Sequence, residues 1–317
     1  MKKQFLEQFK TKGEEVNDLF AVKTKGSVKP YKFGFMFTLV VSDKTDEMAL
    51  SYFGGDKKDE VESLHRTFEV QDVIHVKGKT DDFTGPITIA VNTDGEIKKV
   101  DEFDISDFVP KTKKDISTMI NELKDVISKI QDNDIKRLLD TIFTKEFMEK
   151  YSLAAAAKTI HHSFAGGLLE HVLSMVKISL RMVELYPELN KDLLIAGCIL
   201  HDIGKVNEIK VKTAIDYTTE GHLVGHISMG QKMVNDVIEK LDNFPDILKH
   251  KIIHLILSHH GEKKLGSPVE PLLPEAHALH HIDMLDSQVQ KVLQQKEKAY
   301  AGEKWVMYKD WPTLYLE

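Results

Sequence analysis

The fold is decided by the stretch Ile199-Leu200-His201-Asp202-Ile203-Gly204-Lys205, in which two ionisable side chains follow an apolar run. The preceding residues, 193–200, are apolar almost all round, which is typical of a buried helix rather than a surface one. We therefore expect His201 and Asp202 to enter the protein interior. A buried, unpaired carboxylate is costly, so an aspartate beside a histidine indicates a compensating cation, most economically a metal ion.

The bulk composition indicates an ordinary globular protein. The chain has 317 residues, a length that predicts roughly two domains. No apolar run approaches the ~20 residues of a membrane helix, and charged residues follow Met1–Phe5 where a signal peptide would have its apolar core. We therefore expect a cytoplasmic protein with no membrane partner. The single cysteine, Cys198, lies in the apolar run and is expected to be an inert core residue.

Short strands broken by glycine-containing turns dominate the first 100 residues. Between the third and fourth strands, Lys57–Phe68 carries apolar residues at helical spacing. Five strands with a helix in that place follow the order of a small OB-type barrel, a scaffold that commonly binds single-stranded polymers. The predicted strands are Val16–Val22, Tyr31–Ser42, Glu47–Phe53, Asp72–Lys79 and Pro86–Asn92.

Aromatic and basic residues interleave at the start of the second predicted strand. Tyr31 and Phe33 offer rings on which bases could stack, and Lys32 offers a cation for a phosphate. The same rings alternate along one strand face, and such a face is more often barrel core than binding surface. The core interpretation is favoured for Phe35 and Phe37, whereas Tyr31 and Phe33 are equally compatible with either role.

The periodicity becomes helical after a charged stretch. We predict an OB-type nucleic-acid-binding domain at 1–100, a linker at 101–115, an all-α domain at 116–300 and a carboxyl-terminal tail at 301–317. The fold class is therefore α+β with two domains. Beyond the helical stripes that begin at Ile116 and Ile135, the predicted helices are Gly167–Tyr186, Asp192–Asp202, His222–Leu241, Pro245–His259 and Pro274–Tyr300.

Histidines mark the second domain as the one that carries the chemistry. The chain has 15 histidines, and only His65 and His75 precede residue 161. Inward-facing ligands from separate helices are typical of metal sites in helical bundles. Imidazoles and carboxylates without thiolates favour a first-row divalent ion such as Mn²⁺, Fe²⁺, Co²⁺ or Zn²⁺. The candidate ligands lie on five segments: His171, the pair His201 and Asp202, His226, the pair His259 and His260, and Asp283, with Asp286 as an alternative to Asp283.

This order of ligands resembles the HD superfamily of metal-dependent phosphohydrolases in its dinuclear form. The resemblance runs from Ser163 to the neighbourhood of Gln290. The amino-acid sequence of 161–171 and 220–227 looks like that of the YhaM-type 3′-5′ exoribonucleases. These enzymes join an amino-terminal OB domain to a carboxyl-terminal HD domain. The domain order predicted from the periodicity agrees with that arrangement.

The resemblance also implies roles for individual residues. It implies two divalent ions, with Mn²⁺ as the first candidate, and places Asp202 between them. Lys205, next to the His-Asp pair, would contact a phosphate oxygen. Apart from the resemblance, His162 and His222 are the best candidates for substrate contacts among the remaining histidines, although histidines in such places are more often surface or supporting residues. One ion would be held by His171, His201, Asp202 and Asp283, and the other by Asp202, His226, His259 and His260.

Three functions are compatible with these features. The first is a two-metal 3′-5′ exoribonuclease that degrades single-stranded RNA, with single-stranded DNA as a second candidate substrate. The second is an HD-type phosphohydrolase of nucleotides or cyclic dinucleotides. The third is a non-catalytic factor that binds single-stranded nucleic acid. The net charge of −7 means that polynucleotide binding must be local, and the sequence leaves self-association into a homo-oligomer open.

Overall fold

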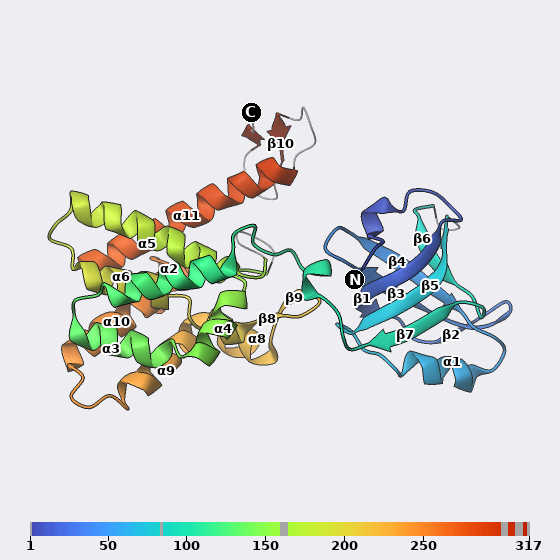
Figure 1. Cartoon of the computed structure of the whole chain (residues 1–317), viewed down its shortest axis with the longest axis horizontal. Coiled ribbons are helices and arrows are strands. Elements are labelled where there is room, and N and C mark those ends of the chain that lie inside the picture. The colour runs from blue at the N-terminus through green and yellow to red at the C-terminus, as the bar shows by residue number, and fades with distance from the viewer. Residues whose placement is uncertain (1, 83–84, 159–163, 299–303, 308–312, 316–317) are drawn as a thin grey trace. The chain divides into compact units, whose positions relative to one another are not determined.

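The structure is a computed structural model that describes all residues except 1, 83–84, 159–163, 299–303, 308–312 and 316–317 (Figure 1). The chain divides into two compact units. The barrel unit comprises Met1–Pro110 and Val211–Ile215, and the helical unit comprises Lys111–Lys210 and Asp216–Glu317. None of the helices in the described part of the chain has the length and apolar character needed to cross a membrane.

Five strands of the barrel unit close into a barrel within the described residues, in the order β1-β3-β4-β6-β5 and back to β1. The β4–β6 pair is parallel and the other four pairs are antiparallel, and α1 lies between β4 and β5. The predicted OB-type barrel is thereby confirmed. Its elements are η1 (Leu6–Gln8), β1 (Glu15–Lys25), β2 (Lys29–Tyr31), β3 (Gly34–Ser42), β4 (Glu47–Phe53), α1 (Lys58–His65), β5 (Val73–Asp81), β6 (Thr88–Val91), β7 (Glu96–Val100) and η2 (Ile105–Asp107).

Alternation along the strands fills the barrel. On β3, the side chains of Phe37, Leu39 and Val41 are buried, and the residues between them are only half-buried. This is the period of two that a strand with one face toward a core requires. Phe37 is therefore a core residue, as the alternation favoured.

The single predicted strand Tyr31–Ser42 is wrong at its start. The chain turns at Lys32 and Phe33, so that Tyr31 ends β2 and pairs with Gly34 at the beginning of β3. Gly34 has a φ of +146°, and a Cβ there would lie 2.2 Å from the carbonyl oxygen of Gly55. Only glycine tolerates this approach, and the alternating aromatic pattern concealed the turn.

Two further features of the barrel unit were absent from the prediction. Strand β7 pairs antiparallel with β5, although Lys98 and Lys99 give it little apolar alternation. After β7, Phe108 and Val109 are buried against Ala21 in a small second cluster. Three residues of the predicted linker, Phe103, Phe108 and Val109, therefore pack on the barrel.

The helical unit is a bundle, as predicted. A helix ends just before the His201–Asp202 pair and another begins just after it, and two small two-stranded sheets accompany the bundle among the described residues. Its helices are α2 (Ile116–Ser128), α3 (Asn133–Ile142), α4 (Lys145–Leu153), α5 (Gly167–Leu185), α6 (Lys191–Leu200), α7 (Lys205–Glu208), α8 (Thr219–Val224), α9 (His226–Ile238), α10 (Asp246–Ser258), η3 (Lys263–Leu265) and α11 (Pro274–Lys298). Its small sheets are β8 (Ile209–Val211) with β9 (Ile215–Tyr217), and β10 (Trp305–Val306) with β11 (Leu314–Tyr315).

Helix α6 is the centre of the bundle. All of its residues from Leu193 to Leu200 are buried, as an apolar run without a polar face requires. It packs against α5, α10 and α11 (Figure 1). The predicted helix His222–Leu241 is interrupted, because Gly225 has a φ of +76° and ends α8, so that α9 begins at His226.

The tip of the β8–β9 hairpin belongs to the barrel unit. Val211 and Ile215 pack against the cluster that contains Val73 and Phe108. The Thr213 hydroxyl donates to the carbonyl of Gln71 at 2.8 Å. Two segments of the chain thus form the barrel unit: Met1–Pro110 and Val211–Ile215, the second of which follows soon after His201 and Asp202.

Candidate metal centre

The His201–Asp202 pair lies in the interior, as its place after the apolar helix predicts. Helix α6 ends at Leu200, and the side chains of His201 and Asp202 are 0% and 4% exposed. His201 Nε2 lies 3.2 Å from Asp202 Oδ2, and the ammonium of Lys205 lies 2.6 Å from the same oxygen. The carboxylate that would otherwise be costly to bury therefore has a cation on one side.

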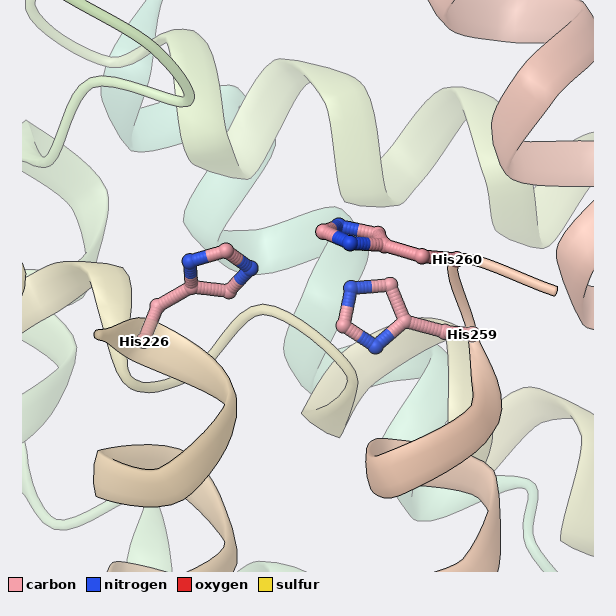
Figure 2. A group of neighbouring side chains, drawn as sticks. All are labelled: His226, His259 and His260. Carbon is pink, nitrogen blue, oxygen red and sulfur yellow. The ribbon is translucent and has the colours of Figure 1, made fainter. Parts of the chain in front are cut away.

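Six candidate ligand atoms, one of them from His201, fall into two groups around Asp202. In each group the ligand atoms lie within 4.8 Å of one another. The second group comes from the start of α9 and the end of α10, and its rings face one another in Figure 2. The first group is His171, His201 and Asp283, and the second is His226, His259 and His260.

The Asp202 carboxylate contacts both groups. Its Oδ1 atom lies 3.4 Å from His226 Nε2 and 3.6 Å from His259 Nε2, while Oδ2 faces His201. All seven side chains proposed from sequence as ligands are thus brought together, and Asp202 stands between the groups.

Hydrogen bonds at Nδ1 hold all five rings of the two groups in one tautomer. Three of the acceptors are backbone carbonyls and two are carboxylates. Since these oxygens only accept, Nδ1 carries a proton in every ring and Nε2 is the atom left to face a metal ion, an arrangement typical of metal-binding histidines. The bonds run from His201 to Cys198 O (3.0 Å), His259 to Ile256 O (2.7 Å), His260 to Leu265 O (3.0 Å), His171 to Asp286 Oδ2 (2.7 Å) and His226 to Glu208 Oε1 (3.1 Å).

Several buried polar atoms of this centre make no hydrogen bond among the described residues. They are the Nε2 atoms of His201, His226 and His259 and the Oδ1 atom of Asp202. A buried acceptor without a partner costs about 1–3 kcal/mol, and these acceptors converge. Divalent cations at the two groups would satisfy them, and nitrogen and oxygen donors without sulfur suit Mn²⁺, Co²⁺, Fe²⁺ or Zn²⁺. The residues present therefore fit a metal ion.

Charges in the centre are arranged for a cation. Burial and neighbouring imidazoles lower the pKa of His259 well below its usual range, which keeps its lone pair available. Burial opposes ionisation of Asp202, but Lys205 and His201 hold the pKa of this carboxyl well below its usual range. Although burial lowers the pKa of His171, its carboxylate partners Asp283 and Asp286 raise it to about 9.

The remaining sequence candidates of the helical unit lie elsewhere. His222 is exposed on α8, with its ring 5.0 Å from that of Tyr217, and it belongs to neither group. His162 lies outside the described residues. Asp286, the alternative ligand, instead accepts from His171 Nδ1 and from the Ser174 hydroxyl.

Sequence reasoning missed Glu208. This carboxylate lies one helical turn after Lys205, in a segment where the neighbouring Ile209 is buried. An acidic residue in such a segment is a signal of a polar network, since carboxylates are rarely buried without a partner. The spacing His-Asp-x-x-Lys-x-x-Glu could therefore have indicated it.

In the barrel unit, the aromatic candidates surround the β2–β3 turn. Phe33 at the turn is 72% exposed, and the ammonium of Lys32 lies 5.2 Å from its ring. Tyr31 donates its hydroxyl to Gly54 O at 3.0 Å, and its ring lies 6.1 Å from Phe33 and 5.4 Å from Phe53. Phe53 thus extends the aromatic row that was predicted from Tyr31 and Phe33.

Comparison with known proteins identifies the class and then the family. The family described as HD domain matches residues 168–288, which makes the helical unit an HD domain and implies dependence on a divalent metal. YhaM 3′-5′ exoribonucleases are 33% identical in Oceanobacillus iheyensis (93% of this chain, 91% of that protein), 32% in Shouchella clausii (92% and 89%) and 31% in Bacillus subtilis (92% and 90%). The chain belongs to the YhaM family of 3′-5′ exoribonucleases, and the predicted resemblance is confirmed.

Proposed function

We propose that this protein is a 3′-5′ exoribonuclease that hydrolyses single-stranded RNA with two divalent ions, Mn²⁺ being the first candidate. The observation that carries the proposal is the convergence of five imidazoles and two carboxylates in one buried centre, in a chain that belongs to this family. Single-stranded DNA is a second candidate substrate, because the phosphodiester that the centre would hydrolyse is common to RNA and DNA.

Each residue of the centre has a definite task in this mechanism. One ion would be held by the group of His171, His201 and Asp283, the other by the group of His226, His259 and His260, and Asp202 would serve both. Bound ions would activate a water for attack on phosphorus and stabilise the charge that develops there. The chain's own part is to fix the lone pairs through the Nδ1 bonds and to keep Asp202 ionised.

Lys205 is proposed to contact a phosphate oxygen. Its side chain is 12% exposed, and burial opposes its charge, but Asp202 raises its pKa so that it stays an ammonium. A charge held near the reacting phosphate contributes to binding of the transition state rather than to uptake of ions.

Replacing Lys205 with alanine is expected to lower kcat on RNA by about 10²-fold, because one fixed charge near the reacting phosphate is lost. Elemental analysis should find the same ion content as in wild type. Lys210→Ala, which removes an exposed lysine shortly after the motif, is the matched control. Loss of ions in proportion to activity would instead show that Lys205 only supports Asp202.

The barrel unit is proposed to bind the RNA strand through the row Phe33, Tyr31 and Phe53. An aromatic side chain as exposed as Phe33 lies outside the barrel core, and the nearby Lys32 supplies a cation for a phosphate. Stacked rings beside a cation suit single strands of any sequence.

Phe33→Ala is expected to weaken binding of a single-stranded oligoribonucleotide, since base stacking contributes about 1–3 kcal/mol per base. Fluorescence anisotropy in the presence of chelator would measure it without cleavage. Hydrolysis of a small phosphodiester should be unchanged. Val70→Ala, which truncates another exposed apolar residue of the barrel unit, is the control. Unchanged RNA affinity would remove Phe33 from the binding surface.

The function itself is tested with end-labelled RNA and added metal. A 5′-labelled oligoribonucleotide should shorten stepwise with Mn²⁺, resist when its 3′ end is blocked, and stay intact with chelator. A panel of nucleotides and cyclic dinucleotides should turn over much more slowly. Intact RNA under Mn²⁺, Co²⁺, Fe²⁺ and Zn²⁺ alike, or faster turnover of the small molecules, would contradict the proposal.

A further inference from the structure

Glu208 is a buried carboxylate that lies outside both groups of candidate ligands. Its residue is 6% exposed. A single oxygen, Oε1, accepts from the backbone N–H of His226 at 2.9 Å and from His226 Nδ1 at 3.1 Å. That oxygen therefore fixes both the first residue of α9 and the orientation of its imidazole.

The backbone of Glu208 is itself held by close contacts. Its N–H donates to Gly204 O at 3.0 Å, and its carbonyl accepts from Thr218 N–H at 2.9 Å. Gly221 approaches so closely that a Cβ there would lie 2.4 Å from the Glu208 carbonyl oxygen. Any larger residue at 221 would push the segment away, so the position of Glu208 is strongly determined.

The two groups of candidate ligands each contain one imidazole backed by a carboxylate. His171 has Asp286, which also accepts from Ser174, and His226 has Glu208. The other rings are backed by neutral carbonyls. A carboxylate behind a ligand histidine fixes its tautomer and raises its basicity more than a carbonyl does.

We propose that Glu208 is a positioning residue for the group His226, His259 and His260, acting through His226, and that Asp286 has the same role for the other group. The inference rests on the proposed metal-dependent function. Each ion then depends on its own carboxylate, so the affinity of one ion can be lowered without changing that of the other.

A purely structural role for Glu208 makes a different prediction. The carboxylate also caps the amino terminus of α9, where backbone N–H groups have no partner within the helix. Loss of a cap lowers stability and does not select one ion. Ion affinities measured separately, together with thermal unfolding of the ion-free protein, distinguish the two roles.

The experiment titrates Mn²⁺ into chelator-stripped full-length protein by calorimetry. Glu208→Ala is expected to weaken one of two binding events by about 10–100-fold and leave the other unchanged. Glu208→Gln keeps an acceptor oxygen but loses the charge, so it should weaken ion binding less than Glu208→Ala does. It should also fold like the wild-type protein. Asp286→Ala should weaken the other event. Glu220→Ala, which removes an exposed carboxylate from α8, is the control.

A double-mutant cycle tests whether Glu208 acts through His226. In a His226→Ala background, Glu208→Ala should have no further effect, whereas Asp286→Ala should add its full effect. Two normal binding events in Glu208→Ala, or equal weakening of both, would overturn the inference alone. A wild-type protein that takes up no ion would overturn the proposed function together with it.

Discussion

Replacing Asp202 with alanine is expected to abolish hydrolysis of RNA, with a loss of at least about 10³-fold in kcat, or ~4 kcal/mol of transition-state stabilisation. The carboxylate contacts members of both ligand groups, at 3.2 Å on one side and 3.4 Å on the other. In the proposed mechanism, both ions would lose a shared anionic ligand. Single-turnover assays and ion content by elemental analysis measure the two effects.

Controls separate this loss from a packing defect. Asp202→Asn keeps the volume and removes the charge, so it should be nearly as inactive as the alanine variant. Asp236→Ala removes a carboxylate that is 46% exposed on α9 and should behave as wild type. The far-ultraviolet circular dichroism should be unchanged in all three. Substantial RNA hydrolysis by Asp202→Ala would remove Asp202 from the mechanism.

Replacing Gly204 with alanine is expected to damage both the fold and the site. A Cβ at this position would lie 2.0 Å from the carbonyl oxygen of His226 and 2.7 Å from the backbone nitrogen of Gly230. Both neighbours are backbone atoms of α9, so the helix itself must move. Overpacking of this kind costs about 1–3 kcal/mol, and displacement of His226 should lower kcat by about 10²-fold.

Denaturant unfolding and steady-state hydrolysis measure the two consequences. Gly55→Ala is the matched control, because a Cβ there meets no atom within 4 Å. If Gly204→Ala is as stable and as active as Gly55→Ala, close approach of α9 to the ligand motif is not required for the site.

Much of the fold could be predicted because local patterns agreed with tertiary structure. The uniformly apolar run before His201 has no alternative but burial, and the five barrel strands carry clear alternation around their turns. The prediction missed β7, because its lysines interrupt the alternation of apolar and polar residues that marks a strand. It also missed the turn at Lys32 and Phe33, because the alternation of aromatic residues continues through that turn.

The sequence could predict which residues form the site, but not the hydrogen bonds that orient them. Histidines and aspartates within apolar helices are unusual enough to be noticed one at a time. The partner that fixes each ring is a property of the packed structure. Glu208 meets His226 where Gly204 permits the close approach of α9 and Gly221 permits that of α8. Asp286 backs His171 across more than one hundred residues of chain.

The location of the β8–β9 tip within the barrel unit restricts how the protein can be dissected. A fragment that stops at Pro110 lacks Val211 and Ile215, so the apolar surface around Val73 would be left open to water. Dividing the chain once after Pro110 therefore yields a barrel fragment without residues 211–215 and a helical fragment that still carries them. An autonomous barrel would require residues 211–215 to be grafted back by a designed connection, and studies of truncated forms should be planned with that in mind.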